Sequence, residues 1–167
     1  IENGKEAVYE ESAAAVAEVV FVMDRFGYCK LLDRTVYERN RETVDNEYKY
    51  VIPCLNTDKL CIFTDTGNLH QVKMMDIPSG NLSKYDGSKE EIVVLTNFGR
   101  LTGQILLFAT KMAMVKQVPA EEFVTNNRTV AATKLQEGDS LLTVRIAGTE
   151  TDLVLQSASG MFLRFSM

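Results

Sequence analysis

An internal repeat runs through most of this chain. Four segments share one pattern, in which an apolar run leads to a small turn residue and then to a strand that carries a basic or ionisable side chain. Self-similarity at a regular period indicates an array of equivalent structural units. The four turn residues are Gly27, Gly67, Ala113 and Gly160.

The spacing of these turns identifies the kind of unit. Successive turns are separated by 40, 46 and 47 residues (27 to 67, 67 to 113 and 113 to 160). Propeller blades of four strands have periods of about 40–50 residues. Each of the last three units is expected to begin with a further strand, at residues 50–55, 91–96 and 139–145, that turns and leads into the hairpin after it. The sequence therefore predicts an all-β, propeller-like fold of about four blades of roughly 40–47 residues.

The residue types between the turns agree with strands. Val, Ile, Phe and Thr crowd the apolar runs, and Gly, Asn, Asp and Ser separate them, as in chains rich in hairpins. Residues 6–18 have some helix propensity, although we expect them to be extended and to lead into the first blade. An ordinary β-sandwich with regular strand spacing is the alternative, but repetition of the whole unit favours radial repetition.

Composition excludes several classes of protein. Hydrophobic residues make up 46% and charged residues 25% of the 167 residues, which is typical of a folded chain. No apolar run reaches the roughly 18 residues that a membrane span needs. The chain starts without a secretory signal pattern. Cys29, Cys54 and Cys61 form no C-x-x-C pair, which indicates reduced thiols in a cytoplasmic protein.

The sequence contains no constellation typical of a catalytic or metal site. His70 is the single histidine, so a Ser-His-Asp, Cys-His or zinc site would depend on it alone. We expect His70 to have a polar surface role. Phosphate-binding and nucleophile-elbow motifs are absent. The adjacent carboxylates Glu90–Glu91 and Glu121–Glu122 are interpreted as solvated surface, because neighbours in a strand point to opposite faces.

Basic residues recur at fixed offsets from the turns. A cationic or ionisable side chain lies three residues after the first three turns, at Lys30, His70 and Lys116, and four residues after the last, at Arg164. Equivalent positions of successive blades lie along one rim of a propeller, so the period predicts a curved basic stripe. Such a stripe would neutralise DNA phosphates without reading bases.

Other basic residues lie close to this stripe in the sequence, beside the turns or in the loops after the strands. Net charge is 18 − 23 = −5, which argues against a nucleic-acid partner and in favour of an alternative, a propeller that binds another protein. The acidic excess must then lie on other faces and loops, and DNA binding should depend strongly on salt. The candidate DNA-binding residues are Arg25, Lys30, Arg34, Arg39, Arg41, His70, Lys73, Arg100, Lys111, Lys116, Arg128 and Arg164.

Three stretches carry a resemblance to a known family. Residues 106–116, the Gly138-Asp139 pair within residues 132–141, and the run from Pro119 through Phe123 to Arg128 resemble blade signatures of one kind of domain. That domain is the C-terminal domain of the A subunit of bacterial type IIA DNA topoisomerases, gyrase and topoisomerase IV. The similarity extends over roughly residues 18–167, and the order and spacing of the motifs carry it more than any single motif.

The resemblance implies a β-pinwheel whose blades exchange strands and bend double-stranded DNA around a basic rim. Residues 1–167 would form a single C-terminal DNA-wrapping domain or a fragment of one. The DNA would be presented for ATP-dependent strand passage, which relaxes, decatenates or supercoils it. The parent enzyme would be cytoplasmic and nucleoid-associated, with no membrane association, would use ATP and Mg, and would include an ATPase B subunit together with the remainder of the A subunit. This chain would hold no cofactor or metal, and no catalytic centre, because none of its six tyrosines follows an Arg as the family's catalytic Tyr does.

The sequence departs from the family pattern in three places. The gyrase box Gln-Arg-Arg-Gly-Gly-Lys-Gly is absent, and the nearest loop is Thr125 to Val130. This favours a topoisomerase IV-like subunit, with a gyrase fragment that lacks the box as the alternative. The stretch at residues 78–81 is shorter than the family's loop. Four repeats are also fewer than the family's five or six, which predicts an open or incomplete disc.

Overall fold

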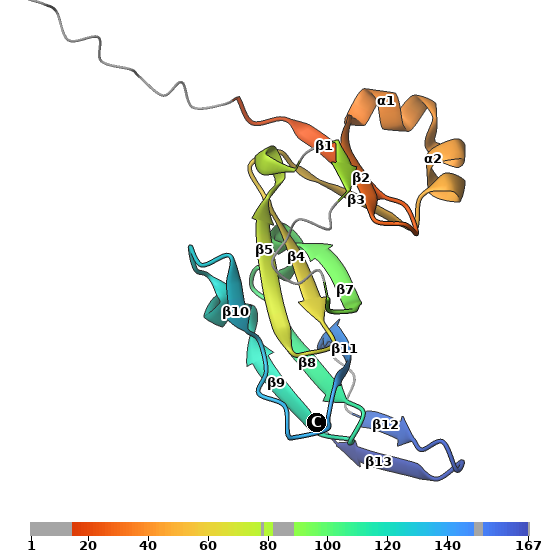
Figure 1. Ribbon diagram of the computed structural model, residues 1–167, viewed down its shortest axis with the longest axis vertical. Coiled ribbons are helices and arrows are strands. Elements are labelled where there is room, and N and C mark those ends of the chain that lie inside the picture. The colour runs from red at the N-terminus through yellow and green to blue at the C-terminus, as the bar shows by residue number, and fades with distance from the viewer. Residues whose placement is uncertain (1–14, 78, 82–88, 149–151, 167) are drawn as a thin grey trace, which may run out of the picture.

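The computed structural model describes residues 15–77, 79–81, 89–148 and 152–166. Small antiparallel sheets follow one another along the long axis of the molecule, and the helices labelled α1 and α2 lie at one end (Figure 1). Strand accounts for 47% and helix for 17% of the structure, and the sheets close into no barrel. The predicted all-β repeat fold is therefore confirmed. Of the stretch at residues 6–18, residues 6–14 lie outside the described part, and the first strand begins at Glu18.

The described residues form four sheets, and each is built on one hairpin. Sheet 1 has the order β3-β1-β2-β6, from β1 (Glu18–Met23), β2 (Tyr28–Asp33), β3 (Tyr50–Leu55) and β6 (Gly80–Asn81). Sheet 2 has the order β10-β5-β4-β7, from β4 (Lys59–Thr64), β5 (Asn68–Lys73), β7 (Ile92–Asn97) and β10 (Thr129–Ala131). Sheet 3 has the order β11-β8-β9, from β8 (Ile105–Thr110), β9 (Val115–Pro119) and β11 (Leu141–Ile146). Sheet 4 is the hairpin of β12 (Asp152–Gln156) and β13 (Phe162–Ser166).

Strands are exchanged between neighbouring sheets. β6 follows β5 in the chain but pairs with β2 in sheet 1, where Tyr28 lies opposite Asn81. β10 follows β9 but pairs with β5 in sheet 2, where His70 lies opposite Thr129. The second and third hairpins are thus each followed by a segment that completes the sheet before them. This is the strand exchange that the family resemblance implies.

The upstream strands are grouped differently from the sequence-based expectation. β3, β7 and β11 were each assigned to the hairpin that follows them. Each instead pairs with the hairpin that precedes it, through β1, β4 and β8 respectively. The expectation was wrong because the turn after each of these strands leads the chain into the next sheet rather than back along the same one.

All four turn residues adopt left-handed backbone. Their φ angles are 88° at Gly27, 82° at Gly67, 63° at Ala113 and 82° at Gly160, and Ala113 is the one non-glycine residue of the described part with positive φ. A hydrogen bond from each turn residue's N–H to the carbonyl three residues earlier closes the loop. This is the three-residue hairpin in which a type I turn is followed by a left-handed residue.

The first residue of each loop is polar, and in three of the loops it helps to close the turn. Asp24, Thr110 and Ser157 each accept a hydrogen bond through a side-chain oxygen from the N–H four residues later, at 3.0, 3.2 and 3.0 Å. Asp, Ser and Thr are favoured at the first position of a type I turn for this reason. The turn sequence therefore specifies both the loop conformation and the hairpin register.

A second feature recurs seven residues after each of the first three turns. There the chain enters a helical turn, at α1 (Arg34–Arg39), η1 (Met74–Asp76) and η3 (Ala120–Phe123). η1 and η3 precede the exchanged strands β6 and β10. In the first repeat the chain continues instead into a second helix, α2 (Arg41–Glu47).

Helices α1 and α2 cover the outer face of sheet 1 (Figure 1). Val44 of α2 is buried with Val20 and Val22 of β1, and Tyr37 of α1 packs against the same cluster. These helices were not predicted from the sequence, because their residues are mostly polar and carry a weak apolar pattern. Tertiary burial of one side stabilises short helices that propensity alone does not.

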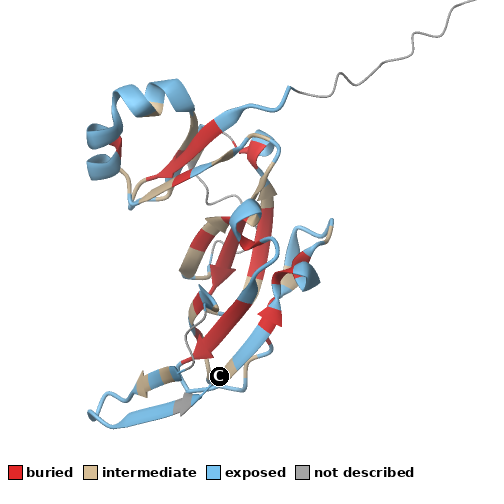
Figure 2. Cartoon of the chain, turned by 180° about the vertical axis from the view of Figure 1, so that it is seen from behind, coloured by how far each residue is buried: buried red, intermediate tan, exposed pale blue. Residues whose placement is uncertain are grey.

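The other buried clusters lie between neighbouring sheets. One joins sheets 1 and 2 and includes Phe21 and Ile62, and the other joins sheets 2 and 3 and includes Phe63 and Phe108. Burial is concentrated on the central strands and becomes sparse on the β12–β13 hairpin (Figure 2). The core is therefore a series of interfaces between sheets, as in other repeat proteins.

The left-handed turns predict a graded set of stability changes. Ala113→Gly should stabilise the chain by about 0.5–1 kcal/mol, because the left-handed strain of about 1–2 kcal/mol exceeds the entropic cost of glycine. Gly160→Ala should destabilise it by about 0.5–1 kcal/mol through the same balance of left-handed strain and chain entropy, and no clash adds to this loss because nothing lies within 4 Å of the added Cβ. Gly67→Ala should cost at least about 1 kcal/mol more than Gly160→Ala, because its Cβ would lie 2.6 Å from the Thr133 carbonyl oxygen. Urea unfolding of the three variants measures this order, and equal losses for the two alanine variants would contradict it.

Candidate nucleic-acid interface

The hairpin register shows which candidate rim residues are equivalent. Lys30, His70 and Lys116 lie opposite Val22, Ile62 and Phe108 in their hairpins, and these partners all lie five residues before the turn. The corresponding residue of the fourth hairpin is Leu163, opposite Leu155. Arg164 lies one residue further along the strand. Because side chains alternate, Arg164 lies on the other face, and its assignment to the stripe was wrong.

His70 is buried, with 4% of its surface exposed. Its Nδ1 lies 2.9 Å from Oγ1 of Thr129 on the exchanged strand β10, and its Nε2 lies 2.6 Å from Oε2 of Glu90. The predicted surface role of His70 was therefore wrong, because the exchanged strand and the residues before β7 cover it. Sequence spacing gave no sign that residues 20 and 59 positions away would enclose this ring.

Glu90 is the centre of this polar network and not the solvated surface residue that was expected. Its Oε1 accepts hydrogen bonds from Thr66 Oγ1 at 2.6 Å and from Asn68 Nδ2 at 2.8 Å. Burial raises the pKa of Glu90, but hydrogen bonds from Thr66, His70, Asn68 and Thr64 outweigh burial and lower the pKa to about 2. The network joins β5, β10 and the start of β7, so it stabilises the strand exchange.

The lowered pKa of Glu90 predicts a pH-dependent contribution to stability. Because folding lowers this pKa from 4.5, the contribution is complete above about pH 4.5 and is lost as the pH falls toward about 2. At pH 7, Glu90→Gln should destabilise the chain by roughly 1–3 kcal/mol through loss of charge-assisted hydrogen bonds. The difference from the native sequence should shrink between pH 4.5 and pH 2.

Denaturant unfolding at several pH values measures this effect. Glu91→Gln is the matched control, because the neighbouring Glu91 is exposed and the substitution removes the same charge. A Glu90→Gln penalty that stayed constant from pH 7 to about pH 2 would contradict the role of the carboxylate.

Two of the predicted rim residues do present a cation. Lys30 is half-buried, and its Nζ lies 5.5 Å from the ring centroid of Tyr48. Lys116 is exposed, and its Nζ lies 5.9 Å from the ring centroid of Phe108, which is directly opposite on β8. The continuous stripe of four cations is therefore reduced to two separated positions.

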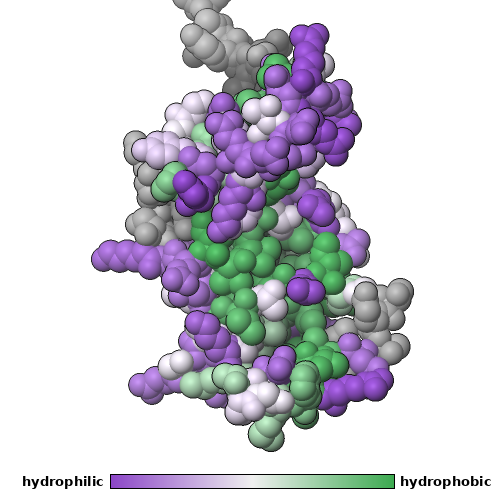
Figure 3. All heavy atoms as spheres, turned by 90° about the vertical axis from the view of Figure 1, so that its right-hand side faces the viewer, coloured by the Kyte–Doolittle hydropathy of each residue, from purple (hydrophilic) through white to green (hydrophobic). Residues whose placement is uncertain are grey.

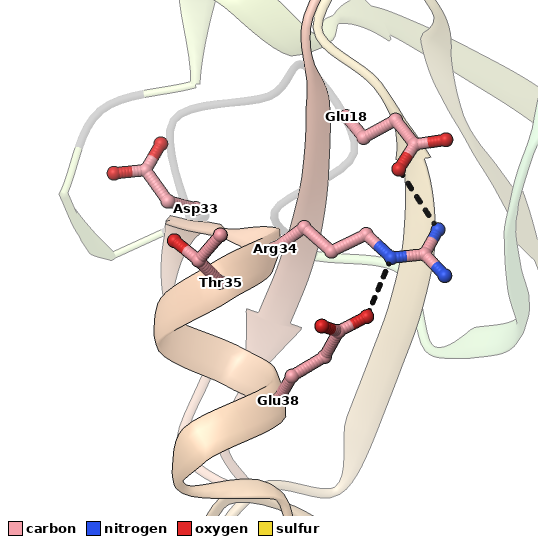
Figure 4. A pocket seen from close by; sticks show the side chains of 5 residues that line it. All are labelled: Glu18, Asp33, Arg34, Thr35 and Glu38. Carbon is pink, nitrogen blue, oxygen red and sulfur yellow. Dashed lines mark hydrogen bonds and ion pairs between the residues drawn. The ribbon is translucent and has the colours of Figure 1, made fainter.

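Three other candidates are paired with carboxylates. Arg34 contacts Glu18 at 3.1 Å and Glu38 at 2.9 Å, in a shallow depression that Asp33 also lines (Figure 4). Arg41 contacts Asp45 at 3.7 Å, and Arg164 is paired with Asp152. Neighbouring carboxylates reduce the attraction of each arginine for an anion.

Arg39 and Arg41 were expected in a loop at the rim, but they lie on α1 and α2, respectively. Arg34 was expected beyond the first turn, and it is the first residue of α1, directly after β2. These helices cover the outer face of sheet 1, so the loop assignment was wrong. The remaining exposed candidates form no ion pair with any described residue, and they are Arg25, Arg39, Lys73, Arg100, Lys111, Lys116 and Arg128.

Some of the acidic residues stabilise turns, because their carboxylates accept hydrogen bonds from nearby N–H groups. Asp58 accepts hydrogen bonds from the N–H groups of Lys59 at 2.7 Å and Gly99 at 3.1 Å, and from Nδ2 of Asn97 at 2.6 Å. Asp139, in the Gly-Asp pair of the family motif, accepts from the N–H groups of Met112 and Ser140. The net charge of −5 therefore counts carboxylates that accept hydrogen bonds within the fold.

One face of the molecule is apolar at its centre and polar toward both ends (Figure 3). The exposed apolar side chains of the described strands include Leu142 and Ile146 of β11 and Val154 of β12. Apolar patches of this kind are typical of contacts with other proteins or domains.

The described residues carry few features of other kinds of site. No group of three or more His, Cys, Asp or Glu side chains is placed to hold a metal ion among them, and none of their helices is long and apolar enough to cross a membrane. Cys54 and Cys61 are free thiols, and burial raises the pKa of Cys61 to about 12.

Comparison with known proteins finds sequence relatives over most of the chain. No family model matches the chain. The DNA gyrase A subunit of Lawsonia intracellularis (strain PHE/MN1-00) is 29% identical over 170 residues, which cover 89% of this chain and 21% of that protein. The DNA gyrase A subunit of Streptococcus pyogenes serotype M1 is 25% identical over 179 residues, which cover 94% of this chain and 22% of that protein. The chain thus spans about one fifth of the length of the curated relatives it matches.

Solved structures with a similar fold include C-terminal domains of topoisomerase IV and gyrase A. The C-terminal domain of DNA topoisomerase IV matches with a TM-score of 0.75 at 18% identity, over 92% of this chain and 53% of that one. The C-terminal domain of E. coli ParC matches with a TM-score of 0.69 at 15% identity, over 90% of this chain and 65% of that one. The C-terminal domain of DNA gyrase A matches with a TM-score of 0.55 at 18% identity, over 89% and 54%.

The fold is therefore that of the β-pinwheel C-terminal domains of topoisomerase A subunits. The sequence homologues are, more particularly, DNA gyrase A subunits, while the structural neighbours include both topoisomerase IV and gyrase A. The resemblance predicted from the blade motifs is confirmed.

Proposed function

We propose that this chain binds double-stranded DNA without sequence specificity and bends it, as the C-terminal domain of a type IIA topoisomerase A subunit. The proposal rests on one observation. The hairpins of this pinwheel fold carry exposed lysines and arginines that form no ion pair with a described carboxylate. Arg25 and Lys111 occupy the same position, two residues before the left-handed turn, in the first and third hairpins. Lys116 follows the turn in the third hairpin.

The proposed mechanism is electrostatic and elastic. Smooth bending of 20–30 base pairs costs about 1–6 kcal/mol. Phosphate contacts that release counterions from the DNA can offset this cost. Because phosphate contacts carry no sequence information directly, the preference would be for bent or crossed duplexes and not for a base sequence.

We place this activity within a larger enzyme. In this proposal the domain presents DNA for ATP-dependent strand passage by an ATPase B subunit together with the remainder of the A subunit, in the bacterial cytoplasm and nucleoid. ATP and Mg would be bound by those other parts, and this chain would contribute no catalytic group and no cofactor site.

Charge reversal on the hairpins tests the proposal. The variant Arg25→Glu/Lys111→Glu/Lys116→Glu should bind a duplex of about 40 base pairs more weakly, and its log–log salt slope should be lower by about 3, or about 1 for each lost phosphate contact. Fluorescence anisotropy from low to physiological salt measures the slope. Energy transfer between dyes at the two ends of the duplex measures bending, and the native chain should draw the ends together.

The control is the variant Lys49→Glu/Lys134→Glu/Arg145→Glu, which makes the same change in net charge at exposed residues outside the candidate set. It should keep most of the native slope. If both triple variants lost the same slope, net charge and not these hairpin positions would govern binding.

The alternative function is that of a propeller that binds another protein. The apolar centre of the face in Figure 3 and the net charge of −5 favour it. The same titration separates the two functions, because a protein-binding module would leave the duplex unbound even at low salt.

A further inference from the structure

Two of the four hairpin loops expose a large apolar side chain at the same position. Phe26 and Met112 each lie one residue before the left-handed turn residue, and they are 68% and 52% exposed. The equivalent residues of the second and fourth hairpins are polar, Thr66 and Ser159. Gly, Pro, Asn, Asp and Ser are the residues that turns favour. The turn geometry therefore does not explain a phenylalanine or a methionine at this position.

A cation accompanies the apolar side chain in both loops. Arg25 precedes Phe26 and Lys111 precedes Met112, whereas an aspartate and an alanine occupy this position in the second and fourth hairpins. The Arg25 guanidinium lies 4.9 Å from the ring centroid of Phe26, within the range of a cation–π contact. Positive charge and apolar surface therefore occur together at the ends of the first and third hairpins.

Hydrogen bonds fix the backbone that presents these side chains. The N–H of Phe26 donates to Oδ1 of Asp24 at 2.8 Å, and the N–H of Met112 donates to Oδ1 of Asp139 at 3.0 Å. A loop that is already ordered loses little conformational freedom when it enters another molecule. Both loops are thus suited to insertion of an exposed side chain into a partner.

We propose that Phe26 and Met112 are wedges that enter between stacked base pairs of a bound duplex from the minor groove and kink it. In minor-groove proteins, apolar side chains such as Phe and Met unstack base steps and kink the duplex by about 20–90°, while Arg and Lys contact the groove beside them. The cation before each wedge would have this second role.

This inference rests on the DNA binding proposed above and adds a local source of bending to it. Part of the bend would arise from kinks at the first and third hairpins, in addition to the smooth bending that phosphate contacts produce. The kinks should form at pyrimidine–purine steps, because these steps are unstacked most easily.

The double variant Phe26→Thr/Met112→Ser tests the wedges. It gives both loops the residue types that the second and fourth hairpins have at this position, and it leaves the preceding cations unchanged. With a duplex of about 40 base pairs that contains TA steps, the variant should keep the native salt slope, because no phosphate contact is removed. Its affinity should change by less than about tenfold, since the apolar contact and the cost of unstacking are lost together.

The bending measurements should change while the salt slope stays constant. Energy transfer between dyes at the two ends should show that the ends lie farther apart in the variant complex than in the native complex. Thymines at the TA steps should react with permanganate in the native complex and be protected in the variant complex, because permanganate attacks unstacked thymines.

Two further variants serve as controls. Leu142→Ala/Val154→Ala removes exposed apolar side chains of β11 and β12, outside the hairpin loops, and should keep the native bend. Phe26→Leu/Met112→Leu should keep it as well, because leucine is also used as a wedge. Phe26→Thr/Met112→Ser should keep the native melting temperature, and a lower one would assign the two side chains to folding of the loops and overturn the proposal.

The titrations distinguish failure of the wedges from failure of the proposed function. If Phe26→Thr/Met112→Ser bends the duplex as the native chain does, the wedges are wrong and the proposed DNA binding stands. If its bend is native and its salt slope falls by about 1, Phe26 acts by positioning Arg25 on a phosphate, and the wedges are again wrong. If the native chain leaves the duplex unbound at low salt, the proposed DNA binding is wrong, and the wedges are rejected with it.

Discussion

Strand exchange between neighbouring sheets is the interaction on which the rest of this structure depends. An isolated two-stranded hairpin is marginally stable in water, and here β6 and β10 each add an outer strand to the hairpin of the preceding repeat. The sheets then pack through shared clusters, in which the rings of Phe63, Phe108 and Phe123 lie 5.8–6.3 Å apart with edge or tilted geometry. Backbone pairing and aromatic packing thus bind the same two repeats together, so the order of the sheets follows the order of the chain.

The first repeat shows what the chain does where the exchanged segment takes another form. After β2 the helical turn that precedes β6 and β10 elsewhere is extended into α1 and α2, and Val44 and Tyr37 cover the outer face of sheet 1. Arg34–Glu38 and Arg41–Asp45 pairs lie on the helices. An apolar inner side with a polar outer side is the property of helices that cover one face of a sheet. These helices also place Arg39 and Arg41, which follow Lys30 closely in the sequence, outside the hairpin of β1 and β2.

The sequence predicted the turns well because their chemistry is local. A polar residue followed three residues later by glycine specifies a left-handed hairpin loop, and Ala113 fits the same period despite its side chain. Partners across long separations were not predictable in this way. The burial of His70 requires Glu90 and Thr129, which lie 20 and 59 residues away, and the pairing of β3 with β1 reverses the grouping that adjacency suggested. Arg164 lies four residues after its turn residue, whereas Lys30, His70 and Lys116 lie three residues after theirs. Because side chains alternate along a strand, Arg164 lies on the opposite face.

The distribution of charge shows how an acidic chain could bind DNA as proposed. Carboxylates at Asp58, Glu90 and Asp139 accept hydrogen bonds inside the fold, and others neutralise arginines at positions 34, 41 and 164. The cations that remain without described carboxylate partners include Lys73, Lys111, Lys116 and Arg128. Interactions with exposed charges are screened beyond about 10 Å at 0.1 M salt, so a phosphate responds to these neighbouring cations more than to the net charge of −5. The number of cations that contact the backbone, more than the total charge, therefore sets how steeply salt weakens a complex.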